Sequence, residues 1–298
     1  MTPPPWIGTS LAGGLVFVTG KGGVGKSAVA AAVSLVLSRA GQRVLLLEID
    51  PRESLHAWLG VAPSGGERVA VAPRLALESL RPRSLVDRQV EERIPVRLLA
   101  RRLLAHPMYQ QFVDGAPGLE ELAVLDHVER SLRGEFDTVV LDGAASGHAL
   151  GQLRAPELVA EVVHSGPFAR LAARLEELVA DPRRCRSVLV ATAEEMPVEE
   201  TLELAGSLAG ALGRPAALLA INQLAPDDLP AARPGEAAPL ALWRRRLALQ
   251  ERCRERLLAG WRGAVVELPW LPLPRGAALA RSLAERLAAA PPARPEAR

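Results

Sequence analysis

A glycine-rich stretch at residues 20–27, GKGGVGKS, contains the only two lysines in the chain, Lys21 and Lys26, in a protein that otherwise uses arginine. The stretch fits the pattern G-x-x-x-x-G-K-[ST], in which backbone N–H groups and a lysine cradle phosphates. Lysine is a compact charge, whereas the planar, forked guanidinium of arginine does not replace it between two phosphates. We therefore expect Lys26 to contact the β- and γ-phosphates of a nucleotide. The alternative is a chance placement of two lysines, which the flanking strand and helix disfavour.

The whole loop is predicted to bind phosphates, because glycines let N–H groups turn toward anions and the next helix adds positive potential. The hydroxyl of Ser27 can bind Mg²⁺. The residues that we expect to contact the nucleotide here are Gly20, Lys21, Gly22, Gly23, Val24, Gly25, Lys26, Ser27 and Ala28.

Two aspartates follow apolar runs that have the character of buried strands. Asp50 ends the run in LLLEIDPRESL, where its carboxylate can orient an attacking water. Asp142 follows four apolar residues in FDTVVLDG, where it can hold Mg²⁺ through water. Ser27, Asp50 and Asp142 are thus the expected metal-binding residues. The alternative for Asp50 is a carboxylate that stabilises the N-terminus of a helix.

Asn222, in AINQLAP, is the only asparagine in the chain and follows another apolar run. An asparagine side chain can pair with N6 and N7 of adenine at once. We expect Asn222, Gln223 and Pro269 to lie around the base. The alternative for Asn222 is a turn residue in the left-handed region.

Six short apolar runs are predicted to be buried strands, and the stretches between them include helices at 27–41 and 197–212. Continuous apolar strands that alternate with helices predict an α/β fold, a doubly wound and mainly parallel sheet of the P-loop type. Ligands bind at the carboxyl ends of such strands. The six predicted strands are 15–20, 43–50, 136–143, 186–192, 216–223 and 263–269.

The length of 298 residues is interpreted as one domain over 1–298. Within it we expect a helical subdomain at about 83–133, a Pro/Ala loop at 225–241 and a disordered tail at about 290–298. The Arg-rich stretch 242–263 is interpreted as a packing helix rather than a nucleic-acid-binding one, because glutamates interrupt its basic face.

The net charge of +2 gives no argument for a nucleic-acid or membrane partner. No apolar run reaches the roughly 18 residues of a membrane span, so stable membrane insertion is not expected. Cys185 and Cys253 stand alone, without a zinc-type or disulfide spacing, so the expected location is the cytoplasm.

The motifs together resemble those of the arsenical-pump and tail-anchored-protein targeting family of P-loop ATPases. KGGVGKS resembles the deviant Walker A form, and Asp50, Pro51, Ser54 and Leu55 match the first switch. DGAASGHAL resembles the second switch at Asp142, Ala144, Gly147, His148 and Leu150. NQL at 222–224 and the Pro-Gly-x-x-Glu segment within 114–122 extend the similarity over about residues 15–285.

The resemblance implies ATP rather than GTP, Mg²⁺, and a dimer in which Lys21 reaches the partner's nucleotide. It also implies that Asp50, Pro51, Asp142, Gly147 and His148 move with the nucleotide state. The alternative for His148 is a hydrogen-bonded interface histidine. Lys21, Lys26 and Asp50 are the expected catalytic residues.

The sequence also departs from this family. Gly143, Ala145, Ser146 and Gly151 replace its Thr, Pro, Thr and Arg, and Glu53 replaces a histidine. With two cysteines a three-thiolate site is impossible, so activation by arsenite is not expected. No Met-rich client helix follows the second switch, and the three methionines are few.

The function expected from the sequence is a dimeric ATPase whose nucleotide-driven opening and closing acts on a protein client. The dimer is a homodimer or a heterodimer with a paralogous ATPase. One alternative is a weakly active or inactive subunit of such a heterodimer. Another is a positioning ATPase of the MinD/ParA type, which needs a membrane-seeking or DNA-binding surface.

Overall fold

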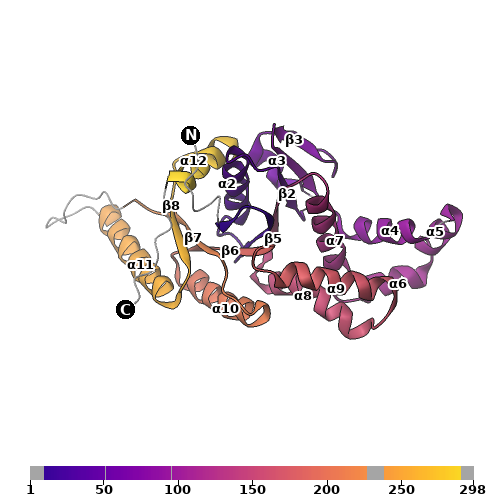
Figure 1. The fold of residues 1–298 in the computed structure, drawn as a ribbon. Coiled ribbons are helices and arrows are strands. Elements are labelled where there is room, and N and C mark those ends of the chain that lie inside the picture. The colour runs from indigo at the N-terminus through magenta and orange to yellow at the C-terminus, as the bar shows by residue number, and fades with distance from the viewer. Residues whose placement is uncertain (1–9, 51, 95, 227–237, 290–298) are drawn as a thin grey trace.

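The computed structural model describes residues 10–50, 52–94, 96–226 and 238–289, built around an eight-stranded sheet (Figure 1). The strands lie in the order β3-β4-β2-β5-β1-β6-β7-β8, and only the β3–β4 pair is antiparallel. The strands are β1 Gly14–Gly20, β2 Val44–Glu48, β3 Val69–Ala72, β4 Leu75–Ser79, β5 Thr138–Ala145, β6 Cys185–Thr192, β7 Leu218–Leu224 and β8 Ala264–Pro269.

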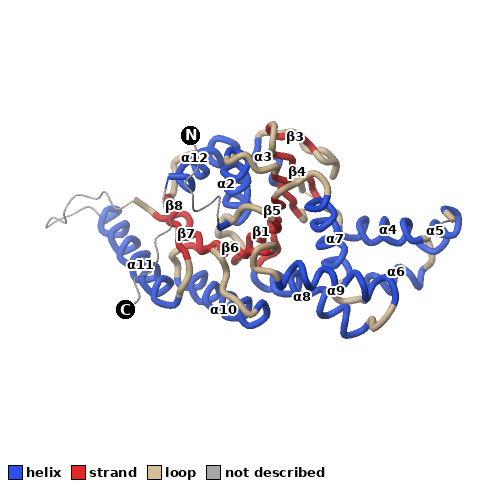
Figure 2. Tube along the Cα trace, in the orientation of Figure 1, coloured by secondary structure: helices blue, strands red, loops and turns tan. Residues whose placement is uncertain are grey.

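Helices cover both faces of the sheet, as the blue segments in Figure 2 show. A first apolar core lies under α2 (Lys26–Arg39), α3 (Ser54–Leu59) and α12 (Ala277–Ala289). A second core lies on the other face, because successive strand residues point to opposite sides. Its helices are α7 Leu119–Arg133, α8 Ser146–Val162, α9 Gly166–Ala180, α10 Glu195–Leu212 and α11 Ala238–Gly260. The mainly parallel α/β fold predicted from the sequence is therefore confirmed.

Three helices extend away from the sheet at the right of Figure 1. They are α4 (Pro82–Arg93), α5 (Arg97–Leu104) and α6 (Pro107–Gly115), and we call them the helical arm. The helical character expected for residues 83–133 is confirmed, since α7 completes this stretch. That the stretch forms a subdomain of its own remains a prediction.

The sequence reading missed β3 and β4. Both are short, and their side chains alternate between more and less buried positions instead of forming one apolar run. The prediction of a loop over 225–241 was wrong at its end, because α11 begins at Ala238. Residues 227–237 and the tail 290–298 lie outside the described residues. The Arg-rich stretch is a helix that buries Leu247, Cys253 and Leu257.

The sheet order brings the predicted site residues to one edge. β1 lies between β5 and β6, so the loop after β1 is flanked by the carboxyl ends of both. Asp142 pairs in register with Val18 of β1 and with Glu48 of β2. Parallel strands end at a common edge, which is where ligands bind in such folds. Within the described residues no helix is long and apolar enough to span a bilayer.

Candidate functional site

The glycine loop turns from β1 directly into α2. Gly25 has a φ of 94° at the helix start, where a side chain would collide with the amide of Asn222. Gly20 has a similar constraint from the carbonyl of Val190. No side chain caps the N-terminus of α2, so its first N–H groups are left for another acceptor. The loop therefore has the features of an anion-binding helix start.

The two lysines of the loop have different partners. The Lys26 ammonium donates to the backbone oxygen of Lys21 at 3.0 Å. Burial lowers the pKa of Lys26, and the nearby Asp142 carboxylate opposes this shift. The Lys21 ammonium forms an ion pair with Glu200 of α10 at 2.7 Å. In this structure the Lys21 ammonium is thus held within its own chain.

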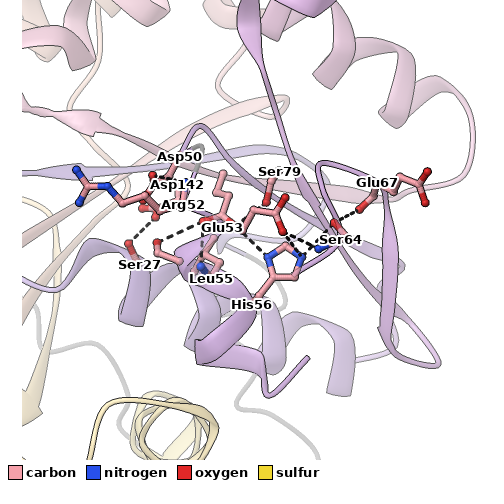
Figure 3. Close-up of polar contacts among 12 residues, drawn as sticks. Ser27, Asp50, Arg52, Glu53, Leu55, His56, Ser64, Glu67, Ser79 and Asp142 are labelled. Atoms are coloured by element: carbon pink, nitrogen blue, oxygen red, sulfur yellow. Dashed lines mark hydrogen bonds and ion pairs between the residues drawn. The ribbon is translucent and has the colours of Figure 1, made fainter. Parts of the chain in front are cut away.

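Ser27 and Asp142 meet at the end of the loop (Figure 3). The Ser27 hydroxyl donates to Oδ2 of Asp142 at 2.6 Å. The other oxygen, Oδ1, is buried and has no hydrogen-bond partner among the described residues. Burial raises the pKa of Asp142 to about 6, although the Ser27 hydrogen bond and Lys26 act in the opposite direction. A buried carboxylate oxygen beside a serine hydroxyl fits the oxygen ligands that Mg²⁺ prefers.

Asp50 lies after β2 in a tight turn. Its Oδ1 accepts from the Arg52 backbone N–H at 2.9 Å, and its backbone oxygen accepts from the Glu53 N–H at 3.0 Å. Pro51 lies outside the described residues. Asp50 does not supply the carboxylate at the start of α3, because Glu48 does so. The Asp50 side chain therefore binds its own turn.

A buried polar cluster around Glu48, which was not predicted from the sequence, holds this turn in place. Figure 3 labels its members Leu55, His56 and Ser79. Glu48 accepts from the Leu55 backbone N–H at 2.9 Å and from the hydroxyl of Ser79 at 2.6 Å. Nδ1 of His56 lies 3.3 Å from Oε1 of Glu48. A glutamate inside the apolar run VLLLE was the available signal, since buried charges are paired.

Glu53, which replaces the family's histidine, closes the same cluster from the other side. It has a left-handed φ of 51°, and its carboxylate accepts from the Ser64 backbone N–H at 2.6 Å. Nε2 of His56 lies 3.7 Å from this carboxylate. The imidazole therefore lies between the two buried carboxylates, Glu48 and Glu53.

The neighbours of Gly143 and Ala144, which follow Asp142, were not predicted from the sequence. A Cβ on Gly143 would lie 2.5 Å from the Phe17 ring, so this ring occupies the space of the family's threonine side chain. The Ala144 N–H donates to the side chain of Gln152 at 3.0 Å, a contact that the sequence reading missed. Gly147 and His148 lie in the first turn of α8, and His148 is exposed. Their motion with nucleotide state remains a prediction.

Asn222 and Gln223 lie against the glycine loop. The Asn222 amide, 4% exposed, donates to the Val24 oxygen at 2.9 Å. Gln223 has a φ of 60° and donates to the Gly23 oxygen at 3.4 Å. The left-handed turn expected as the alternative for Asn222 thus occurs one residue later, at Gln223.

A pocket of about 380 Å³ extends from the loop toward α12. It brings together the predicted phosphate residues Lys26 and Ser27 and the predicted base residues Asn222, Gln223 and Pro269. The remaining lining residues are Gly23, Gly25, Ala28, Trp58, Trp270, Leu271, Leu273, Arg275, Leu279 and Leu283. A concave site of this size suits a small ligand.

A glycine loop between β1 and α2, at the carboxyl edge of a doubly wound sheet, defines a P-loop nucleotide-binding protein. The chain belongs to the ArsA ATPase family, described as anion-transporting ATPases, whose sequence model matches residues 14–165. The resemblance stated from the motifs is therefore confirmed.

Several relatives share this similarity. An arsenical pump-driving ATPase of Acidiphilium multivorum is 29% identical over 252 residues, which cover 77% of this chain and 42% of that protein. A putative arsenical pump-driving ATPase 2 of Aquifex aeolicus is 27% identical, with 71% and 80% covered. The ATPase BagA of Mycobacterium tuberculosis is 26% identical, with 74% and 70% covered. The chain spans less than half of the first of these relatives.

Proposed function

We propose that this chain binds ATP with Mg²⁺, hydrolyses it, and works as a nucleotide-driven switch in a dimer. The observation that carries the proposal is the pair Ser27–Asp142 beside Lys26. Its hydroxyl-to-carboxylate distance is 2.6 Å, and the second carboxylate oxygen lacks a partner among the described residues. A buried oxygen without a partner costs free energy, which a cation recovers.

The proposal assigns a role to each residue of the site. Lys26 and the N–H groups at the start of α2 bind the phosphates, and Lys26 exchanges its bond to the Lys21 oxygen for one to a phosphate. Ser27 and Asp142 hold Mg²⁺, Asp142 in part through water. When bound, the ion neutralises charge on the phosphates. Asp50 orients the attacking water, and its backbone turn is fixed by the Glu48 cluster.

Lys21 acts on the nucleotide of the partner protomer in this proposal. Its ion pair with Glu200 must first break, since the pair holds the ammonium in its own protomer. Dimer closure would therefore exchange one anionic partner of Lys21 for another. The dimer is a homodimer or a heterodimer with a paralogue. The heterodimer remains an alternative because Gly143 replaces the family's threonine and the Phe17 ring fills that space.

The nucleotide cycle acts on a protein client or partner, and the helical arm supports this part. Leu98 and Leu99 of α5 and Met108 of α6 are 58–72% exposed. These three side chains lie on two helices that contact each other, and exposed apolar side chains that gather on one surface mark interaction sites. The names of the relatives mention arsenicals, but this chain offers only Cys185 and Cys253, both buried, and burial raises the pKa of each thiol.

The proposal is tested by ATP turnover of the purified chain, with Asp50→Asn as the matched inactive variant. We expect Asp50→Asn to lower turnover by about 10²–10⁴-fold while ATP binding persists. Binding without turnover above that variant would support the dependent subunit of a heterodimer. Failure of the folded chain to bind ATP at all would reject the proposal.

A further inference from the structure

Arg275 and Trp58 form a contact at the wall of the pocket, and neither is among the predicted site residues. Arg275 precedes α12, and its guanidinium carbon lies 5.3 Å from the centre of the Trp58 ring on α3. Both residues line the same pocket as Lys26 and Ser27. This distance is within the range of a cation–π interaction.

The charge of the pocket is one-sided. Lys26 and Arg275 are the charged side chains among the described residues that line it, and no aspartate or glutamate is among them. Arg275 is exposed and has no carboxylate partner in the part of the chain that the structure describes. Asp142 lies near Lys26 but does not line the pocket, so the charged lining is cationic and suits an anionic ligand.

The Trp58 ring orients this arginine. Trp58 is 8% exposed, and its indole nitrogen is buried without a hydrogen-bond partner among the described residues. Because a tryptophan N–H usually finds an acceptor, hydrogen bonding does not explain why this ring is here. The ring packs in the apolar core under α2, α3 and α12, and its face also lies under the guanidinium, where stacking leaves the arginine N–H groups for oxygen ligands.

The backbone under this pair is tightly packed. A Cβ on Gly60, at the end of α3, would lie 3.2 Å from the Ala277 side chain at the start of α12. One on Gly276 would lie 3.6 Å from the Ala57 oxygen. The start of α3 is held by Glu48, two residues before Asp50. One short helix therefore joins the Asp50 turn to the wall that carries Arg275.

We propose that Arg275 is a nucleotide-binding residue that contacts phosphate or ribose oxygens, and that Trp58 is its positioning residue. This inference rests on the proposed function, since it assigns a new contact to the same ligand. It makes α3, the helix that follows Asp50, part of the nucleotide pocket. A nucleotide bound in the pocket then affects both ends of α3, the Asp50 turn before it and the wall with Arg275 after it.

The test is calorimetric titration of Mg-ATP into the full chain and its variants. We expect Arg275→Gln to weaken binding by about five- to twentyfold, as for loss of a charge-assisted hydrogen bond. Trp58→Leu should weaken it to a similar extent, and Trp58→Phe by less, because phenylalanine keeps a ring face. Trp58→Leu should add little in the Arg275→Gln background, which a merely structural role would not produce.

The matched control is Arg246→Gln. Arg246 makes the same kind of contact with Trp243, at 6.0 Å on α11, and does not line the pocket. It should bind ATP as the wild type does. AMP and 2′-deoxy-ATP distinguish which oxygen Arg275 contacts. If the loss of affinity in Arg275→Gln persists with 2′-deoxy-ATP and is smaller with AMP, the contact is to a phosphate beyond the first. If the loss persists with AMP and is smaller with 2′-deoxy-ATP, the contact is to the ribose.

An unchanged affinity for ATP in the Arg275→Gln variant would overturn the inference. This variant should fold, because Arg275 is exposed, whereas Trp58 is buried. If the wild-type chain itself does not bind ATP, the proposed function fails instead. The two failures are therefore separate. Unequal, additive losses in the Trp58→Leu and Arg275→Gln variants would reject the positioning role of Trp58 alone.

Discussion

The phosphate-loop edge of the sheet and the helical arm differ in the kind of group that each leaves unsatisfied. At the edge, the unsatisfied group is polar and buried, namely Oδ1 of Asp142. On the arm the groups are apolar and exposed, namely Leu98, Leu99 and Met108. Both arrangements cost free energy in the isolated chain. The difference teaches that a buried polar group suits an ion and exposed apolar groups suit an apolar partner surface, which are the two contacts that the proposed cycle uses.

The largest expected change in stability among the variants of the phosphate-loop edge concerns Asp142. Its raised pKa means that, between about pH 4 and 6, the folded chain binds more protons than the unfolded one, so stability falls as the pH rises. Asp142→Asn removes this cost. We expect the nucleotide-free variant to be more stable than wild type at pH 8, by at most about 3 kcal/mol, and to gain little at pH 4.5.

Urea unfolding at the two pH values measures this difference. The opposite-sign control is Asp137→Asn. The Arg43 hydrogen bond lowers the pKa of Asp137, so this carboxylate contributes stability that is complete above its unfolded-state pKa and is lost as the pH falls through the lowered pKa. Asp137→Asn should therefore lose stability at pH 8. Equal free energies of unfolding of wild type and Asp142→Asn at pH 8 would contradict the idea that burial of the Asp142 carboxylate lowers the stability of the chain.

The next effect concerns Gly143. Gly143→Thr restores the residue of the family's second switch, but its Cβ would lie 2.5 Å from the Phe17 ring and 2.8 Å from the Val18 oxygen. We expect a loss of about 1–3 kcal/mol, as for overpacking of a well-packed core. A double-mutant cycle with Phe17→Leu should show coupling of at least about 0.5 kcal/mol. Additive losses would show that Phe17 does not fill the place of the threonine.

A smaller effect is expected at Glu200. Glu200→Gln weakens the partner that holds Lys21 in its own protomer, and a partly exposed ion pair contributes about 0–1 kcal/mol. If Lys21 acts on the partner's nucleotide, turnover should rise by about two- to fivefold. Glu199→Gln is the matched control, since its neighbouring pair with Arg256 is also 2.7 Å long. A fall in turnover, or an equal rise in both variants, would count against release of Lys21.

The smallest effect on the isolated chain is expected on the arm. Leu98→Ser with Leu99→Ser should change the free energy of unfolding by less than about 0.5 kcal/mol and leave ATP turnover unchanged, because both side chains are already exposed. Leu122→Ala in α7, where the side chain is 0% exposed, should cost about 2–5 kcal/mol. A comparable loss from the arm variant would mean that the arm packs in solution.

The site could be predicted where chemistry lies in consecutive residues. The roles of the loop 20–27 and of Asp142 were predicted from local pattern, and the structure brings Ser27 and Asp142 within hydrogen-bonding distance. β3 and β4 were missed, because these short strands, at the edge of the sheet and next to it, have alternating burial and lack the apolar run that indicates the central strands.

Contacts that join distant parts of the chain could not be predicted at all. Glu48 meets Ser79 across 31 residues, and Gly143 meets Phe17 across the sheet. Only the strand order brings such pairs together. The ion pair between Lys21 and Glu200 could likewise not be predicted, because the two residues are 179 positions apart.

The glycine loop also concentrates all of the chain's side-chain amine chemistry. Lys21 and Lys26 are its only lysines, so within these 298 residues any acylating reagent or lysine cross-linker that acts on a side-chain amine acts on this loop. Lys21 is partly exposed, while burial lowers the pKa of Lys26, which raises the fraction of reactive, uncharged amine there. A lysine reagent thus labels side chains only in the loop 20–27 and gives no signal from lysines elsewhere in these 298 residues.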